Sequence, residues 1–400
     1  MAKLSWLVNN KLVLFCIGLL MGPFSSYLFI DILHLPVVVP EVVFIPYFFL
    51  FYRRLGLSFR KKVSFWGVIC LWFIFLLFAL IWATWSLMAI LSTARSFLIL
   101  GLFYCIGSKI TFNASLLRVI LIVSIGSIVG WVVKSILNFT TLQFLSGSEE
   151  SVVYGNMIAI AFVFAISLLS NNKFYTLIFV FATNIVLSFT TALRRQIAVS
   201  ILSLLLSLFI LTIKHSKYSY FFIIVLLSIP LYLSLPQIEE FVADNSPNMH
   251  ARIFDRSQRL LEGDLGNSEK SRVDAQNLIF NEFFDLIAPH GYVSQQTAKD
   301  ANTGIFNDIP LYMLAYTFGV LLLFPYLLFL VYRLWVMFRS FLLYGDVCYG
   351  ILFVVGAVML FLHFIDSQMF TVSYSAPFTG LTLGLMFRQT IIKGTSNYKL

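Results

Sequence analysis

Apolar residues follow one another in runs of about 17–22 through most of this chain, the length of helix that crosses the hydrocarbon core of a bilayer. The 400 residues are 60% apolar and 11% charged, whereas a soluble domain is about 45–50% apolar and about 25% charged. Strands of a membrane barrel alternate in polarity and do not produce such runs. The runs therefore exclude one soluble globular core and predict an all-α polytopic membrane protein.

The runs predict about twelve membrane spans. The first is expected to remain in the mature protein, because no small-residue cleavage site follows it. Pro36, Pro40, Glu41 and Pro46 interrupt the second run, which predicts a kinked or re-entrant segment. The predicted spans are 12–30, 36–52, 64–82, 86–107, 117–137, 152–170, 174–191, 196–213, 219–236, 309–332, 349–365 and 371–389.

One long polar stretch, residues 237–308, separates the ninth predicted span from the tenth and holds 12 of the 18 acidic residues of the chain. It divides the sequence into a bundle of nine spans at 1–236, a loop at 237–308, and a last part at 309–400 with three spans and a tail. Loops carry much of the binding and catalytic chemistry of proteins. The side of the membrane that this loop faces therefore decides most of the functional argument.

The charges of the short loops predict that side. With an even number of spans both termini share a side, and the segments there hold 17 of the 27 lysines and arginines against one acid, Asp346. Short loops rich in Lys and Arg stay in the cytoplasm. We therefore expect both termini in the cytoplasm and residues 237–308 outside the membrane. This topology accounts for the net charge of +9, and no basic cluster interleaved with aromatic residues indicates nucleic acid.

Several patterns that hold metals or activated nucleophiles are missing from the sequence. It has no HExxH, GxSxG or GxxxxGK[ST] pattern and no acid-rich metal loop. Its four cysteines lie in or beside the apolar runs, and no CxxC pair occurs. We therefore expect no metal site, no cofactor and no disulfide in the long loop.

Two amphipathic helices are predicted within the long loop. The first, Met249 to Glu262, carries three arginines on one face, because the spacing i, i+4 and i+7 returns to the same side of a helix. This face is expected either to bind an anionic lipid carrier or to rest the helix on lipid headgroups. The three are Arg252, Arg256 and Arg259.

The second loop helix is predicted from Arg272 to Leu286. Ser271 and Asp274 form a plausible capping box at its start, and the Pro-His-Gly turn at 289–291 ends it. Arg272 is expected either to contact a pyrophosphate or to pair with a neighbouring acid at the surface. We expect both helices to fold down on the bundle as a lid.

Two adjacent arginines, Arg194 and Arg195, lie at the outer end of the seventh predicted span, where the positive-inside pattern leaves few cations. The planar guanidinium group matches phosphate oxygens. The pair therefore predicts a phosphate contact in the outer turn 190–196, with snorkelling toward lipid headgroups as the alternative.

A further arginine, Arg95, lies inside the fourth predicted span. An arginine in mid-membrane costs about 2.5–3.5 kcal/mol on insertion scales. Arg95 is therefore expected to face the bundle interior and either a carboxylate or an anionic substrate. The alternative is that the span ends early and leaves Arg95 at the interface.

His290 and Asp308 are the candidate proton acceptors. His290 lies in the Pro-His-Gly turn and is expected to be a base or a surface turn residue. Asp308 lies where the loop re-enters the membrane and is expected to be a base, a helix N-cap ahead of Pro310, or both. His363 and Asp366, near the outer end of the eleventh span, are expected to pair with the intramembrane arginine or to line the same cavity.

The order of these features resembles the O-antigen polymerase and ligase superfamily. That order is many spans, a Ser/Thr-rich span end followed by arginine, a long outer loop late in the chain, and a span entered through a polar residue. The matching segments are Thr190 to Arg195 for the Ser-Arg turn, Arg272 to Gly291 for the arginine, helix and Pro-x-Gly-aromatic stretch, and Asn307, Asp308, Leu311, Leu314 and Gly319 for the His-Asn-x-x-Leu-x-x-Leu-x-x-x-Gly entry.

One departure from the family pattern separates its two branches. Ligases of the superfamily carry a histidine at the re-entry, and the corresponding position here, eleven residues before Gly319, is Asp308. The resemblance is therefore to the O-antigen polymerases (Wzy-type), and it does not support a histidine-based mechanism at that position.

The resemblance implies a metal-independent glycosyltransferase with a GT-C-like fold in the bacterial cytoplasmic (inner) membrane. The donor would be a growing glycan on undecaprenyl pyrophosphate, and the acceptor a repeat unit on the same carrier. Arginines would bind the pyrophosphate group of the carrier, and membrane lipid would surround the protein. A chain-length co-polymerase is left open as a partner.

Three alternative functions remain. A ligase would transfer the finished glycan to another acceptor. A flippase for lipid-linked oligosaccharides would share the spans and internal arginines, although it would usually show two related halves and short loops. The protein could instead be a structural component of an envelope assembly, a role that would not explain the arginines on the outer side.

Overall fold

In the computed structural model of this chain, helices are the regular structure throughout the part that the structure describes, and no strand occurs in that part. The described residues are 10–34, 39–43, 59–82, 87–110, 112–139, 156–170, 182, 194–215, 236–237, 239–240, 243–244, 250, 254–255, 258, 284–292, 310–365, 368–371 and 375–387.

The main helices follow the apolar runs along the chain. They are α2 (Lys11–Leu20), α3 (Phe24–Ser26), the π-helix η1 (Tyr27–Ile32), α5 (Phe59–Trp82), α6 (Leu87–Gly107), α7 (Ala114–Phe139), α9 (Met157–Leu169), α11 (Arg194–His215), α18 (Pro310–Phe318), α19 (Val320–Tyr344), α20 (Val347–Ile365), α21 (Gln368–Thr371) and α22 (Ala376–Met386).

Four of these helices are apolar and long enough to cross a membrane, within the described part of the chain. They occupy 114–137, 195–214, 320–344 and 347–365, and shorter apolar helices lie at 11–20, 66–81, 93–107, 157–169 and 376–386. This is the architecture of a helical membrane protein. The predicted spans at 36–52, 174–191 and 219–236 lie almost entirely outside the described residues.

One predicted span is wrong in shape. The run 309–332 was expected to be a single helix, but α18 ends at Phe318 and α19 begins at Val320. Gly319 between them has a φ of +79°, a conformation that favours glycine and interrupts a right-handed helix. α18 does begin at Pro310, as the Pro at the first helical position predicts, while α19 continues to Tyr344.

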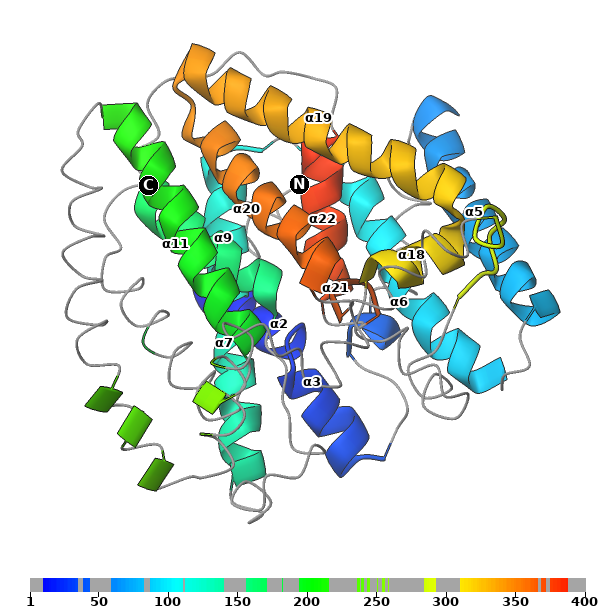
Figure 1. Cartoon of the computed structure of the whole chain (residues 1–400), viewed down its shortest axis with the longest axis horizontal. Coiled ribbons are helices and arrows are strands. Elements are labelled where there is room, and N and C mark those ends of the chain that lie inside the picture. The colour runs from blue at the N-terminus through cyan, green and yellow to red at the C-terminus, as the bar shows by residue number, and fades with distance from the viewer. Residues whose placement is uncertain are drawn as a thin grey trace.

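α9 is the most deeply buried helix of the described bundle. Every residue from Met157 to Leu169 is buried except Leu168. α9 packs against α7, α11 and α20, and Figure 1 shows it behind α11 and α20. A helix that is apolar on all sides has no face for water. The composition of α9 therefore matches its central position.

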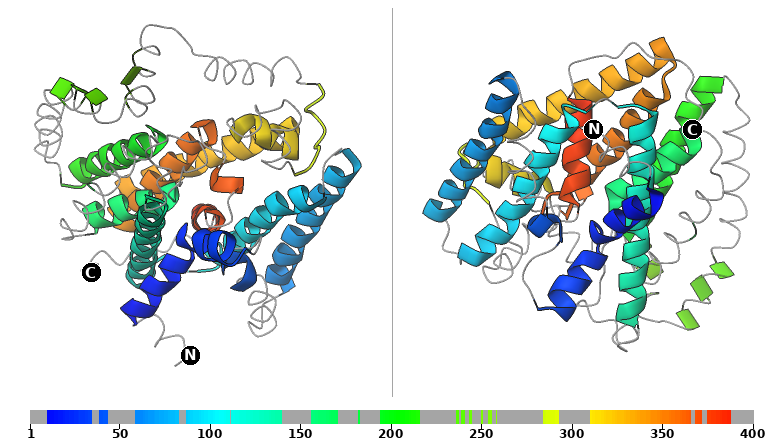
Figure 2. Two further views of the ribbon diagram at one scale, coloured as in Figure 1. Left: turned by 90° about the horizontal axis from the view of Figure 1, so that it is seen from below. Right: turned by 180° about the vertical axis from the view of Figure 1, so that it is seen from behind.

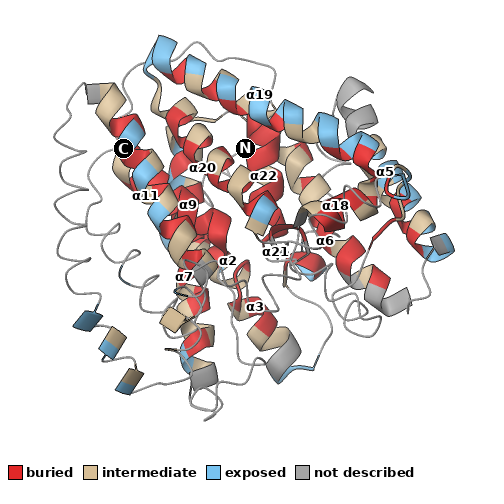
Figure 3. Ribbon diagram, in the orientation of Figure 1, coloured by how far each residue is buried: buried red, intermediate tan, exposed pale blue. Residues whose placement is uncertain are grey.

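α19 has the opposite character, with one buried face and one exposed apolar face. It crosses α20 and α22 obliquely along one edge of the bundle (Figures 1 and 2). Figure 3 shows exposed residues repeating along its outer side. Among these are Leu321, Leu328, Tyr332 and Trp335. An apolar face of this length suits contact with lipid chains.

Glycines allow α2 and α7 to pack backbone against backbone. Gly18 lies in α2 and Gly22 lies two residues after its end, while α7 carries Gly126 and Gly130, so both sides of the contact have a Gly-x-x-x-Gly spacing. A Cβ added at Gly18 would collide with the carbonyl oxygen of Val123. Such small-residue contacts are typical of helices that associate within membranes.

The same device joins α6 and α22. Gly380 lies against the carbonyl oxygen of Leu100, and Gly384 lies against that of Tyr104. Gly107 of α6 faces Gly384 in turn, with 3.1 Å between an added Cβ and the Gly384 Cα. The three Gly-x-x-x-Gly spacings were readable in the sequence and marked helix faces suited to close contact, but they did not identify the partner helices.

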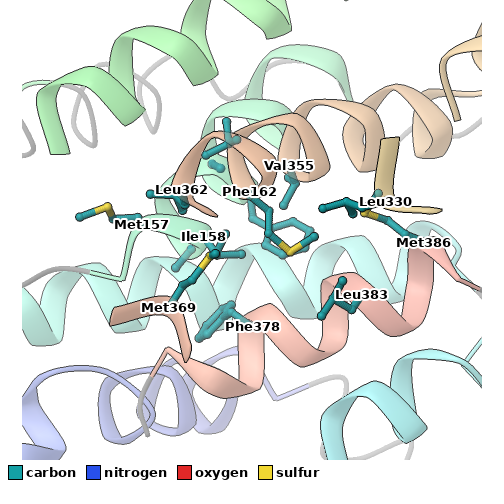
Figure 4. Close-up of a cluster of buried hydrophobic side chains, with 14 of the residues drawn as sticks. Met157, Ile158, Phe162, Leu330, Val355, Leu362, Met369, Phe378, Leu383 and Met386 are labelled. Carbon is teal, nitrogen blue, oxygen red and sulfur yellow. The ribbon is translucent and has the colours of Figure 1, made fainter. Parts of the chain in front are cut away.

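A cluster of apolar side chains gathers the second half of the chain around α9. Figure 4 shows side chains from α9, α19, α20, α21 and α22 meeting in one core. The labelled members are Met157, Ile158, Phe162, Leu330, Val355, Leu362, Met369, Phe378, Leu383 and Met386. Segments more than 200 residues apart in sequence therefore share one packed interior.

Candidate functional site

The end of the long polar stretch docks on the break between α18 and α19. The His290 N–H donates to the Tyr316 carbonyl at 2.9 Å, and the Gly291 N–H donates to that of Thr317 at 3.2 Å. In return, the Val320 N–H donates to the Leu286 carbonyl at 2.8 Å. These bonds use backbone groups that the helix break would otherwise leave unsatisfied. Residues 284–292 are therefore held on the bundle. Residues 284–286, predicted to end the second loop helix, form a turn instead, and the lid of two helices stays a prediction.

An aromatic cluster surrounds this docking point. The ring of Tyr292, which is buried, stacks on Phe97 of α6 at a centroid distance of 5.2 Å. Phe75 of α5 meets Phe318 edge to face at 4.8 Å, and Phe97 also stacks on Phe370 of α21 at 6.1 Å. Such aromatic pairs stabilise beyond the area that they bury. The cluster therefore ties the loop end to α5, α6, α18 and α21.

Gly291 is required at the point of closest approach. Its φ is +89°, and a Cβ there would collide with the Phe75 carbonyl oxygen and the Ala79 amide nitrogen of α5. An L side chain would be strained by the backbone angle and blocked by the neighbouring helix. The glycine of the Pro-His-Gly turn thus fixes where His290 and Tyr292 lie.

His290 lies in this turn and is half-buried, so the prediction of a turn residue at the surface is only partly correct. Its ring stacks on Tyr316 at a centroid distance of 4.5 Å. Burial lowers the pKa of His290 below its ordinary value, and the bonds to Ala288 and Tyr316 and the charge of Asp285 oppose this effect. The imidazole is therefore neutral at pH 7, the form in which it accepts a proton.

Arg95 has the interior carboxylate that the sequence predicted. Its Nη1 donates to Oε2 of Glu41 at 2.9 Å, and the Glu41 side chain is buried. Glu41 lies in the proline-rich segment that was expected to be kinked, of which the structure describes residues 39–43. Trp72 of α5 donates its indole N–H to the carbonyl of Ala94, next to Arg95, at 2.6 Å. The arginine thus lies where three segments meet.

His363 does not pair with Arg95, contrary to one of the expectations. It is fully buried, its Nε2 lies 2.9 Å from the hydroxyl of Tyr326, and its Nδ1 lies 2.7 Å from the carbonyl of Met359. Both ring nitrogens are thereby used inside the bundle. The ring also meets Phe370 edge to face at 5.1 Å, so His363 supports the aromatic cluster.

Arg194 and Arg195 lie in the first turn of α11, where the sequence predicted an outer turn followed by a helix from residue 196. The helix begins two residues earlier than predicted, because nothing in Arg194 or Arg195 disfavours a helix. A helix N-terminus carries partial positive charge and normally attracts acidic side chains. α11 instead begins with two arginines followed by Gln196, and no acidic residue lies in its first turn.

The remaining predicted site residues lie outside the described part of the chain. Near three of them, His250 contacts Asp255 at 3.0 Å and Glu239 at 3.4 Å, and its ring stacks on Phe254 at 5.5 Å. The backbone at 250 and 258 is α-helical and that at 254–255 is π-helical, while the rest of the predicted first loop helix lies outside the described residues. The predicted site residues that lie outside the described part are Arg252, Arg256, Arg259, Arg272, Asp308 and Asp366.

One intramembrane cation was missed in the sequence. Lys134 lies within the predicted span 117–137, and its Nζ donates to the hydroxyl of Ser26 at 2.9 Å. That hydroxyl donates onward to the carbonyl of Pro23 at 2.7 Å. A lone charge in an apolar run was the signal that identifies such a residue.

Metal-ligating side chains do not gather among the residues that the structure describes. No three of their His, Cys, Asp and Glu side chains lie close enough to hold a metal ion.

Comparisons with known proteins add no relative. The chain matches no protein-family model, no curated protein and no solved structure.

Proposed function

We propose that this chain is a polysaccharide polymerase, a metal-independent glycosyltransferase of the bacterial cytoplasmic membrane that resembles the O-antigen polymerases. The observation that carries the proposal is the arginine pair in the first turn of α11. Guanidinium groups match phosphate oxygens, and the N-terminus of a helix favours bound anions. A lipid pyrophosphate is an anion that such a site would hold at the membrane surface.

The proposed topology has about twelve spans in a GT-C-like bundle, with both termini in the cytoplasm and residues 237–308 outside. The basic short loops support this orientation. The docking of residues 284–292 on the α18–α19 break supports a loop that folds onto the bundle rather than one that hangs free.

The proposed reaction transfers a glycan from undecaprenyl pyrophosphate to a sugar hydroxyl of a lipid-linked repeat unit. The bond from the anomeric carbon to the pyrophosphate oxygen breaks, and a new glycosidic bond forms. Arg194, Arg195 and Arg272 would hold the leaving pyrophosphate and stabilise its developing charge. Arg252, Arg256 and Arg259 would rest on the lipid carrier.

Proton transfer in this reaction falls to His290 or Asp308. The acceptor hydroxyl loses a proton as it attacks, and a neutral imidazole within hydrogen-bond reach could take it. The lowered pKa of His290 keeps it in this form. Asp308 lies two positions before the start of α18 in the sequence, so both candidates belong to the same re-entry region.

A gene deletion, with surface polysaccharide resolved on a silver-stained gel, tests this function against its alternatives. A single repeat unit on the lipid core, with the ladder gone, supports the polymerase. Long chains left on the lipid carrier, with no surface glycan, would instead indicate a ligase. Repeat units trapped at the inner leaflet would indicate a flippase.

Point variants test the residues. Arg195→Ala and Arg272→Ala are expected to fail to restore the ladder while inserting normally. Arg339→Ala is the matched control, because Arg339 is exposed on α19 at the end of the helix predicted to face the cytoplasm. A full ladder with Arg195→Ala, at equal expression, would remove Arg195 from the site.

A further inference from the structure

A buried amide without a protein partner follows the arginine pair. Gln196 is fully buried in the first turn of α11. Neither its Oε1 nor its Nε2 forms a hydrogen bond with the residues that the structure describes. One turn further along the same helix face, the hydroxyl of Ser200 is buried and likewise lacks a described partner.

The deeper part of the same helix face is satisfied internally. The Ser203 hydroxyl donates to the Val199 carbonyl at 2.6 Å, and the Ser207 hydroxyl donates to the Ser203 carbonyl at 2.6 Å. These two serines bond within α11 in the way usual for serine in apolar helices. The unsatisfied polar groups of this face therefore lie only in the first two turns, next to the arginines.

Other buried amides of the described residues have structural roles. Oδ1 of the buried Asn156 accepts the Ala159 N–H at 3.1 Å and caps α9, and Oδ1 of Asn113, which is half-buried, accepts the Leu116 N–H at 2.9 Å ahead of α7. Buried polar atoms without partners destabilise a fold, and their presence calls for a reason such as a ligand. Gln196 caps nothing, so a helix-capping role does not supply that reason.

The chemistry of the amide narrows the ligand. A carboxamide presents one acceptor and two donor hydrogens, and a serine hydroxyl both donates and accepts. A phosphate at pH 7 mainly accepts, so it would satisfy Nε2 but leave Oε1 without a donor. A sugar ring carries hydroxyl groups that donate and accept at neighbouring positions, so it satisfies both atoms together.

We propose that Gln196 and Ser200 form a hydroxyl-binding subsite for the sugar directly attached to the pyrophosphate. The inference rests on the proposed function, because the arginine pair places the phosphate at the start of α11. The sugar then lies beside the first two turns of α11, on the face that carries the buried amide and hydroxyl. The subsite makes the enzyme sensitive to which hydroxyl groups the first sugar carries.

The experiment uses the full-length protein purified in detergent, with thermal unfolding followed as ligand is added. The probes are inorganic phosphate and inorganic pyrophosphate, which test the arginine pair alone, and glucose 1-phosphate, galactose 1-phosphate and N-acetylglucosamine 1-phosphate, which add a sugar. Wild type is expected to bind at least one sugar phosphate more than fivefold more tightly than inorganic phosphate.

Gln196→Leu is expected to lose that fivefold preference while pyrophosphate binding changes less than twofold. It is also expected to melt at the same temperature as wild type or higher, because it removes an unsatisfied buried group. Ser200→Ala is expected to weaken sugar binding by a smaller factor. Ser203→Ala and Ser207→Ala are the matched controls and should leave sugar binding unchanged.

Two results would overturn the subsite. One is a Gln196→Leu protein that melts lower and keeps the sugar preference, which would show a structural amide. The other is a wild type that binds pyrophosphate but gains nothing from any sugar. A wild type that binds neither pyrophosphate nor sugar phosphates would instead overturn the proposed function on which the subsite depends.

Discussion

Arg95 of α6 and Glu41 form an ion pair across 54 positions of sequence, with Nη1 and Oε2 2.9 Å apart. The Glu41 side chain is 6% exposed and that of Arg95 30% exposed. A carboxylate buried among apolar helices keeps its charge only beside a cation. The pair therefore anchors segment 39–43 to the bundle and holds the guanidinium group in a fixed position.

Breaking this pair from either side should destabilise the protein. Glu41→Gln leaves Arg95 without its carboxylate, and Arg95→Gln leaves a buried carboxylate without its cation. We expect each to lower the free energy of unfolding by about 3 kcal/mol, the low end for a broken buried pair because Arg95 keeps some exposure. Denaturant titration in detergent measures the effect. Arg339→Gln, at an exposed position, is the control, and an equal loss there would contradict the assignment.

Gly291 should tolerate no side chain. Gly291→Ala combines an unfavourable φ of +89° with a collision against α5, and we expect the loop end to detach. Limited proteolysis within 284–292 should become at least tenfold faster. Gly345→Ala shares the positive φ, at +64°, but meets no atom within 4 Å. If both variants are cleaved equally fast, backbone strain alone explains the effect and the contact with Phe75 does not matter.

The docking of residues 284–292 should weaken in acid. In the unfolded or undocked segment, His290 takes up a proton near its ordinary pKa of 6.5, whereas burial lowers its pKa when docked. Between these two values the undocked state binds more protons, so docking loses free energy as pH falls below about 6.5 and is constant above it. Hydrogen exchange of this segment from pH 5 to 8 measures the change. His290→Gln should abolish the dependence, and an unaltered profile would assign it to another group.

Substitutions at Tyr326 and His363 should have coupled effects on stability, because the two side chains share a hydrogen bond. Tyr326→Phe removes the hydroxyl 2.9 Å from Nε2 and leaves a buried ring nitrogen unsatisfied, which costs about 1–3 kcal/mol. Adding His363→Leu removes the stranded nitrogen as well, so the double variant should lose less than the sum of the two single changes. A double-mutant cycle of thermal stability measures this coupling. Strict additivity would show that the two side chains do not interact.

Metal removal should leave activity intact. The proposed pyrophosphate site consists of arginines and a helix N-terminus, which act as fixed positive charges without a metal. Glycan polymerisation by membranes washed with EDTA should therefore match the untreated rate within a factor of two. Loss of activity with EDTA, followed by rescue with a divalent ion, would overturn the metal-independent mechanism.

The apolar runs located most of the described helices but not their interruptions. Runs such as 64–82 and 86–107 became α5 and α6 with close agreement in bounds. The break at Gly319 was missed because hydropathy is continuous across it, although the glycine is present. Its φ is +79°, and the next residue, Val320, donates its N–H to the Leu286 carbonyl, a contact between distant segments that hydropathy does not report.

In the candidate site too, the sequence predicted some features and missed others. The charge of Arg95 within an apolar run predicted an interior carboxylate, because burying a lone charge is costly. The sequence offered His363 and Asp366, near the outer end of the eleventh predicted span, as partners of Arg95. The bond goes instead to Glu41, in a segment predicted to be kinked or re-entrant. Gln196 gave no signal in the sequence, because an amide beside two arginines is unremarkable until its burial is known.

The sequence by itself determined the class of the protein, the apolar helices and the residues whose burial would need a partner, because these follow from local composition and from the cost of placing charge in lipid. Only the tertiary structure decided which segments meet: α2 with α7, α6 with α22, residues 284–292 with the helix break, and Arg95 with Glu41. The physical reason is that every run is apolar enough to pack against any other. The choice between them is made by glycine contacts and a few directional bonds between distant residues.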